Sequence, residues 1–127
     1  MDRKRTETLT RLARLAGLKR EAELARLAAV ARSRARLQEQ LATLRQIEAP
    51  LDPAEATTDP ALVGARLAHR RWSEAQQRRL NQQLAQVTAD FLRQKPAAAR
   101  AFGRAAVLDR LRTMAVTQRR GAHDENP

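Results

Sequence analysis

Three prolines that lie close together divide this chain into two long segments. They are Pro50, Pro53 and Pro60. A proline has no backbone N–H and its ring clashes with the preceding helical turn, so no continuous helix can include all three. We therefore expect a loop over residues 48–59, a first helix over about residues 6–47 and a second helix over about residues 60–119. Asp59 favours this second start, because an aspartate cap followed by a proline in the first turn is common at helix N-termini.

Large side chains are scarce in this sequence. Aromatic residues make up 2% of the 127 residues, and much of the 43% hydrophobic content is alanine. Because large side chains supply most of the free energy of burial, we do not expect a thick globular core. The abundant Ala, Leu, Arg, Gln and Glu are strong helix formers. The sequence therefore predicts an all-α fold, an elongated two-helix antiparallel coiled-coil hairpin that forms a single domain over residues 1–127.

Apolar residues recur at alternating spacings of three and four in both segments, as they do along the seam of two packed helices. In the first segment these positions are Leu27, Val30, Arg34, Leu37, Leu41, Leu44 and Glu48. In the second they are Leu80, Leu84, Val87, Phe91, Ala98, Ala101, Ala105 and Leu108. We expect the phase of the first helix to be lost near Gly17. A neighbouring stripe then takes over, formed by Leu9, Leu12 and Ala16. We also expect Trp72 to lie on the seam.

The second helix is expected to be the longer one. Pro96 lies inside it and predicts either a kink or the start of a third helix. Because the seam spacing continues across Pro96, a kinked continuous helix is favoured. The extra length predicts that residues 102–120 extend beyond the N-terminus of the first helix. Residues 121–127 are polar and predict a disordered tail.

Residue types suited to catalysis and metal binding are sparse. The chain has no cysteine, so it can form neither a disulfide nor a thiolate metal site. Its two histidines, His69 and His123, lack the spacing of a metal site, and its four glycines are isolated from one another. We therefore expect no enzyme activity, no metal and no cofactor. We also expect a cytoplasmic protein, because we find neither an apolar stretch of roughly 18 residues nor the apolar region of a secretory signal.

The formal net charge of the chain is +11, which implies an acidic partner or a polyanion. Net positive charge is greatest from Ala61 to Arg120, where thirteen basic residues stand against three acidic ones. Three kinds of partner are compatible with this charge. A nucleic acid could stack on Trp72 beside Arg70 and Arg71. A membrane surface could bind the amphipathic C-terminal segment, and so could the groove of another protein.

The sequence of residues 102–120, "FGRAAVLDRLRTMAVTQRR", favours the protein partner. Leu108 and Leu111 provide apolar anchors, and the arginines around them can pair with carboxylates. We find no helix-turn-helix, zinc finger or other nucleic-acid-binding module. We therefore expect this end of the second helix to dock on a protein.

Both ends of the chain resemble one protein family. The segment "LTRLARLAGLKREAELARLAAVARSRARLQEQLATL" resembles the start of the flagellar export protein FliJ family, with its leucine-repeated, basic first turn and its long Ala/Arg/Glu helix. The closing "GRAAVLDRLRTMAVTQRR" is similar to the C-terminal pattern of FliJ, a Leu-acid/basic-Leu-Arg core within a basic helix. The length and the two-helix layout agree as well. This resemblance implies a soluble coiled-coil component of the flagellar type III protein export apparatus, similar to the central stalk of rotary ATPases.

The resemblance also implies partners. FliJ-like proteins insert into the hexameric ring of the export ATPase, contact the export gate and escort export chaperones. The chain would then associate peripherally with the membrane-embedded apparatus, through protein contacts. The end that faces the ring would lie near residues 6–18 and 108–120. The residues implied in partner binding are Phe91, Arg93, Arg104, Leu108, Arg110, Leu111 and Arg112.

Three hypotheses for the function follow. The first is a coiled-coil stalk that binds and regulates an export ATPase, in either a flagellar or an injectisome system, since the stalk proteins of both share this shape. The second is a small, basic, nucleic-acid-associated coiled coil. The third is a coiled coil that dimerises and assembles further hairpins.

Overall fold

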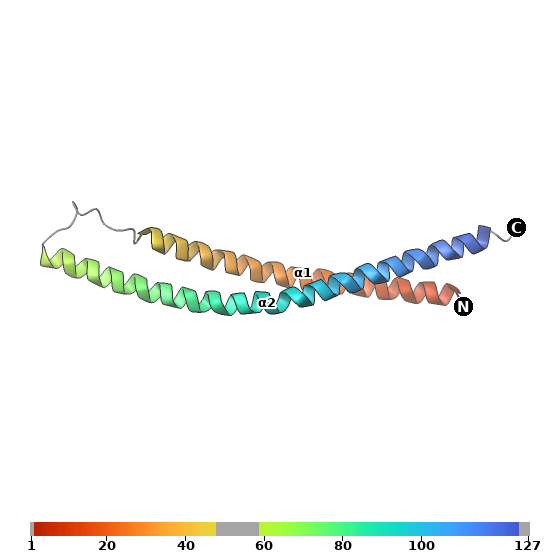
Figure 1. The fold of residues 1–127 in the computed structure, drawn as a ribbon, viewed down its shortest axis with the longest axis horizontal. Helices are drawn as coiled ribbons and strands as arrows, with labels where there is room; N and C mark the ends of the chain where they lie inside the picture. Colours follow the sequence, from red (N-terminus) through yellow and green to blue (C-terminus); the bar gives the residue numbers. More distant parts are fainter. Residues whose placement is uncertain (1, 48–58, 125–127) are drawn as a thin grey trace. The chain divides into compact units, whose positions relative to one another are not determined.

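A computed structural model describes residues 2–47 and 59–124 of the chain. They form two helices, α1 (Asp2–Ile47) and α2 (Pro60–Asp124) (Figure 1). Every described residue other than Asp59 is helical. The two helices pack against each other in antiparallel directions, which confirms the predicted all-α hairpin. Most of the expected loop, residues 48–58, lies outside the described residues.

The start of α2 has a local cause. Asp59 caps α2 as predicted: the N–H of Ala61 donates to its Oδ1 at 3.0 Å, and the N–H of Val63 donates to its carbonyl at 3.0 Å. α1 begins at Asp2, a turn earlier than expected. The hydroxyl of Thr8 donates to the carbonyl of Lys4 at 2.8 Å, as threonines inside a helix do.

α2 runs unbroken through Pro96 and ends at Asp124. A continuous helix is what the seam spacing favoured. Pro96 has no N–H to donate to the carbonyl of Leu92, and both residues are exposed. The helix includes residues 121–124 of the expected tail, and residues 125–127 lie outside the described part of the chain.

The chain divides into two compact units, each of which contains part of α1 and part of α2. Unit 1 comprises residues 1–29 and 91–127, and unit 2 comprises residues 30–90. Within unit 1 the red N-terminal part of α1 lies beside the blue C-terminal part of α2 (Figure 1).

In unit 2 the predicted seam is confirmed. Leu41 is buried, and the half-buried positions are Val30, Arg34, Leu37, Leu44, Leu80, Leu84 and Val87. Glu48 lies outside the described residues. The prediction for Trp72 is wrong, because its side chain is 53% exposed while that of Ser73 is 1% exposed. The seam spacing passes from Leu80 through Gln77 to Ser73, which leaves Trp72 beside the seam.

In unit 1 the alternating spacing continues without a change of phase, so the expected loss of phase near Gly17 is wrong. The buried and half-buried seam positions of α1 are Thr6, Leu9, Ala13, Ala16, Arg20, Glu23 and Leu27. Those of α2 are Phe91, Gln94, Ala98, Ala101, Ala105, Leu108, Arg112 and Ala115. Polar residues hold seam positions at Arg20 and Glu23, which hid the repeat. Leu12 is consequently displaced from the seam and 44% exposed.

The expected overhang of residues 102–120 is wrong for residues 105–110. Ala105, Ala106, Asp109 and Arg110 line one hollow together with residues of α1, namely Ala13, Gly17 and Arg20. This part of α2 therefore lies beside α1. In unit 2, by contrast, the green start of α2 runs past the yellow end of α1 (Figure 1).

Candidate docking surface of unit 1

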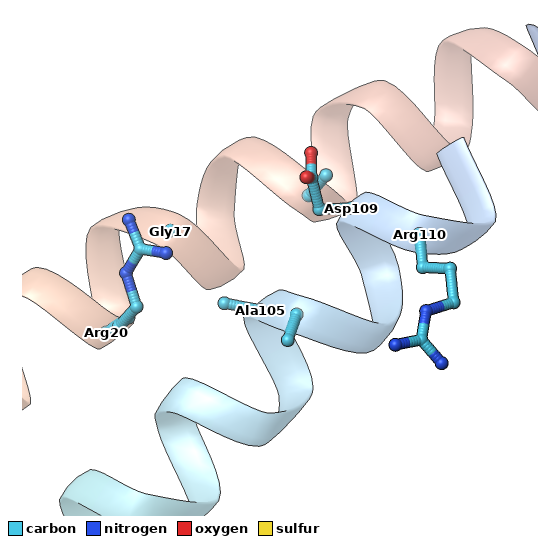
Figure 2. Close-up of a pocket in the computed structure, with 7 residues that line it drawn as sticks. Gly17, Arg20, Ala105, Asp109 and Arg110 are labelled. Carbon is cyan, nitrogen blue, oxygen red and sulfur yellow. The ribbon is translucent and has the colours of Figure 1, made fainter. Parts of the chain in front are cut away.

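Two flanks lie on either side of the seam of unit 1. With the seam residues at heptad positions a and d, the b and e positions of both helices share one flank, and the c and g positions share the other. Two hollows between the helices agree with this assignment. The first, of about 500 Å³, brings together Gly17 and Asp109, both at e positions (Figure 2). The second, of about 220 Å³, brings together Lys19 and Arg104, both at g positions.

The b/e flank carries the exposed acidic residues of the described part of unit 1. They are Glu7, Glu21 and Asp109. All three form ion pairs within their own helix: Arg3 lies 3.7 Å from Glu7, Arg20 lies 3.1 Å from Glu21, and Arg112 lies 2.8 Å from Asp109. Figure 2 shows Ala105 between the helices, and the side chain of Arg110 directed away from α1. The first hollow is therefore walled by small side chains and by charges that largely have partners.

The c/g flank carries a group of exposed apolar side chains from both helices. We call this group the leucine flank, and its members are Leu12, Leu15, Val107, Leu111 and Met114. Leu12 lies one heptad before Lys19 in α1, and Leu111 lies one heptad after Arg104 in α2. Because the two helices are antiparallel, both steps lead in the same direction in space. Because Lys19 and Arg104 line one hollow, Leu12 and Leu111 lie on the same side of the hairpin.

Cations surround the leucine flank. The basic residues at the c and g positions of unit 1, which we call the cationic rim, are Arg5, Lys19, Arg26, Arg93, Arg100 and Arg104. All six are exposed, and no described c or g position of unit 1 holds an acidic residue. Among the described residues, Arg100 and Arg104 form no ion pair. The c/g flank therefore combines apolar area with a net positive charge.

One carboxylate lies beneath this flank, at a seam position. The Oε1 atom of Glu23 is 2.8 Å from Nζ of Lys19 and 3.4 Å from Nη1 of Arg26. The hydrogen bond from Lys19 lowers the pKa of Glu23 below its ordinary value, against the opposing effect of burial, and the charges of Lys19 and Arg26 lower it further. Glu23 thus stays ionised near neutral pH and neutralises part of the rim.

The seven residues implied in partner binding do not form one surface. Phe91, Leu108 and Arg112 occupy seam positions and are half-buried. Arg93, Arg104 and Leu111 lie on the c/g flank, and Arg110 lies on the outer face of α2. The leucine flank adds four residues that this set omitted, namely Leu12, Leu15, Val107 and Met114. An unbroken seam repeat through Arg20 and Glu23 is the sequence signal that could have placed the α1 leucines outside.

Unit 2 carries a separate exposed feature, a pair of stacked rings. The rings of His69 and Trp72 lie 5.8 Å apart between centroids, at an interplanar angle of 26°. Arg70 and Arg71 lie between them in sequence, and all four side chains are exposed. An exposed aromatic face next to two guanidinium groups is the chemistry that stacks on nucleobases and pairs with phosphates.

The described residues contain neither a metal-binding cluster nor a membrane-spanning segment. Within residues 2–47 and 59–124, no group of three or more His, Asp or Glu side chains is placed to hold a metal ion. Neither described helix contains a stretch long and apolar enough to cross a membrane. The chain matches no protein-family model, no curated protein and no solved structure.

Proposed function

We propose that this chain is a non-enzymatic coiled-coil stalk and escort protein of the flagellar type III export apparatus. In this role it binds the export ATPase ring and the export gate, and assists the export chaperones. It belongs in the cytoplasm, at the inner-membrane export apparatus, where protein contacts hold it peripherally. The resemblance of both chain ends to the FliJ family suggests this system.

One observation supports a binding role more than any other. The hairpin leaves five apolar side chains of both helices exposed on the c/g flank of unit 1, beside a cationic rim, whereas the exposed Leu24, Leu92 and Phe102 lie on the b/e flank. Exposed apolar side chains gathered on one side commonly mark a protein-binding surface. Surrounding charges of one sign guide encounter with a partner of the opposite sign. A stalk that docks on larger proteins needs these properties and needs no catalytic pocket.

The proposal is tested by binding to the export ATPase of the same genome. The purified chain and the ATPase are combined, and their co-elution is measured by size-exclusion chromatography, together with the rate of ATP hydrolysis. We expect a stable complex and a changed hydrolysis rate. An unrelated hexameric ATPase serves as the control. Absence of a complex with the export ATPase, or equal binding to the control, contradicts the proposal.

The exposed His69–Trp72 stack favours a second candidate function, nucleic-acid binding. A fluorescently labelled single strand is titrated with the chain, and anisotropy is measured at several salt concentrations. Binding that persists near physiological salt, with a steep salt dependence, supports this function. Trp72→Ala should then weaken binding, whereas Leu67→Ala, at an exposed position of the same helix, should not. Loss of binding at physiological salt contradicts this candidate.

A further inference from the structure

We propose that the leucine flank binds an acidic amphipathic helix of a protein partner, which lies along α1 and α2 as a third helix. This deepens the proposed function, on which it rests for the identity of the partner. The chemistry of the ligand is argued from the described residues of unit 1 alone.

The apolar part of the surface fits a helix. Each of the five side chains of the leucine flank is at least 43% exposed, so none is consumed by the packing of α1 on α2. Val107, Leu111 and Met114 follow one another at spacings of four and three, which places them in one row along α2. Leu12 and Leu15 form a shorter row on α1. Two roughly parallel rows with a seam between them match the apolar stripe of one further helix.

The charges select an acidic ligand. No described c or g position of unit 1 carries an acid, and six carry a cation. The exposed acids of the described part of this unit lie on the opposite flank. A second copy of the chain placed flank to flank would bring two cationic rims together, which is unfavourable. A helix with carboxylates on both sides of its apolar stripe would instead pair with Arg100 and Arg104, neither of which forms an ion pair among the described residues.

The probe for this inference is a synthetic helical peptide of about four heptads, with leucines at its a and d positions and glutamates beside them. A second peptide has the same leucines and lysines in place of the glutamates. Both are titrated into the full chain, and binding is measured by calorimetry near physiological salt. We expect the glutamate peptide to bind and the lysine peptide not to bind.

Two double variants test the apolar contribution. Leu12→Asp with Leu111→Asp should weaken binding of the glutamate peptide at least about tenfold, because both anchors become charged. Leu24→Asp with Leu92→Asp is the matched control, since these leucines are also exposed but lie on the b/e flank. The control should bind as the unmodified chain does. Circular dichroism is expected to show unchanged helicity for both variants.

A charge-reversal variant keeps the test decisive if an aspartate variant loses helicity. Arg100→Glu with Arg104→Glu should abolish binding of the glutamate peptide and create binding of the lysine peptide. This exchange of preference is not expected from a structural defect, which would weaken both.

Several results would overturn the inference. One is binding of the glutamate peptide that is unaffected by the Leu12 and Leu111 substitutions. Another is loss of binding in the Leu24 and Leu92 control as well. A third is capture of the leucine flank by another ligand: sedimentation that shows a dimer dissociated by Leu12→Asp with Leu111→Asp, or binding to anionic lipid vesicles or a DNA duplex that the same variant abolishes.

The outcome is separable from that of the proposed function. If the glutamate peptide binds as expected and the export ATPase does not, the surface stands and the export role falls. If the ATPase binds and the Leu12 and Leu111 substitutions affect neither ligand, the export role stands and the leucine flank is not the docking surface.

Discussion

Lys19 lies on the exposed c/g flank of α1, and its Nζ atom is 2.8 Å from the carboxylate of Glu23 on the seam. The side chain of Glu23 is 7% exposed, whereas that of Lys19 is 64% exposed. The pair therefore joins a shielded anion to a cation that stays in water. It links the packing of the two helices to the charge of the docking surface.

This pair predicts how stability depends on pH. The folded chain lowers the pKa of Glu23, so the unfolded chain binds more protons as the solution is acidified. The contribution of Glu23 is present above the ordinary titration range of glutamate, about pH 4.3, and is lost as the pH falls through the lowered pKa. The melting temperature of the unmodified chain should fall between about pH 7 and about pH 3, partly because the contribution of Glu23 is lost. Glu23→Gln has no such contribution to lose, so we expect its melting temperature to fall by less over the same range. Thermal unfolding followed by circular dichroism measures it, with the exposed Glu21→Gln as control. An equal effect of both variants contradicts the assignment.

The buried alanines of α2 predict a limit on side-chain size at the seam. Ala101 is 6% exposed and faces α1, so a leucine there must push the helices apart. We expect Ala101→Leu to lower the free energy of unfolding by about 1–3 kcal/mol. Ala99→Leu, at an exposed position of the same turn, should change it by less than about 0.5 kcal/mol. Urea denaturation measures both values, and a stable Ala101→Leu variant would show that the helices are not in close contact there.

Pro96 predicts a gain of stability on substitution. Pro96→Ala restores an N–H that can donate to the carbonyl of Leu92 and removes the clash of the ring with the preceding turn. We expect the free energy of unfolding to rise by up to about 3 kcal/mol. The gain is smaller if local adjustment of the helix has already reduced the cost of the proline. Pro60→Ala is the control, because a proline in the first helical turn loses no hydrogen bond. If the two substitutions have equal effects in urea denaturation, the interior position of Pro96 carries no cost.

The exposure of Trp72 predicts its fluorescence. Trp72 is the one tryptophan of the chain, so the emission reports on a single site. We expect the emission maximum of the folded chain to lie close to that of the urea-unfolded chain, and acrylamide to quench both readily. A strongly blue-shifted emission that acrylamide quenches poorly would show that Trp72 is buried on the seam. It would also remove the main support for nucleic-acid binding.

Much of the fold could be predicted from local chemistry. The cap at Asp59 and the seam from Leu27 to Leu44 depend on residues whose neighbours in sequence determine their role. Pro96 was correctly kept inside one helix because the spacing on both sides of it agreed. Here short-range pattern and tertiary packing point the same way, which is why the sequence sufficed.

The site was harder to predict, because it depends on which residues the seam leaves out. Hydrophobicity alone predicts that Leu12 and Trp72 lie on the seam. The seam positions are instead occupied by their neighbours, Ala13 and Ser73. A small side chain fills the narrow space between two close helices, and a large one does not. The leucine flank consists of the apolar residues that this narrow seam excludes. It can therefore be identified only when the packing of both helices is known.

The alanine seam has a consequence for how unit 1 keeps its alignment. Sliding α2 by one heptad would replace Ala98 by Ala105 opposite the same residue of α1, with no change of shape. The same slide would exchange Ala101 for Leu108, which the narrow space cannot accept. The register of the two helices is therefore determined by a few bulky residues, such as Leu9, Leu27 and Leu108. The small residues between them allow close packing but do not select one register.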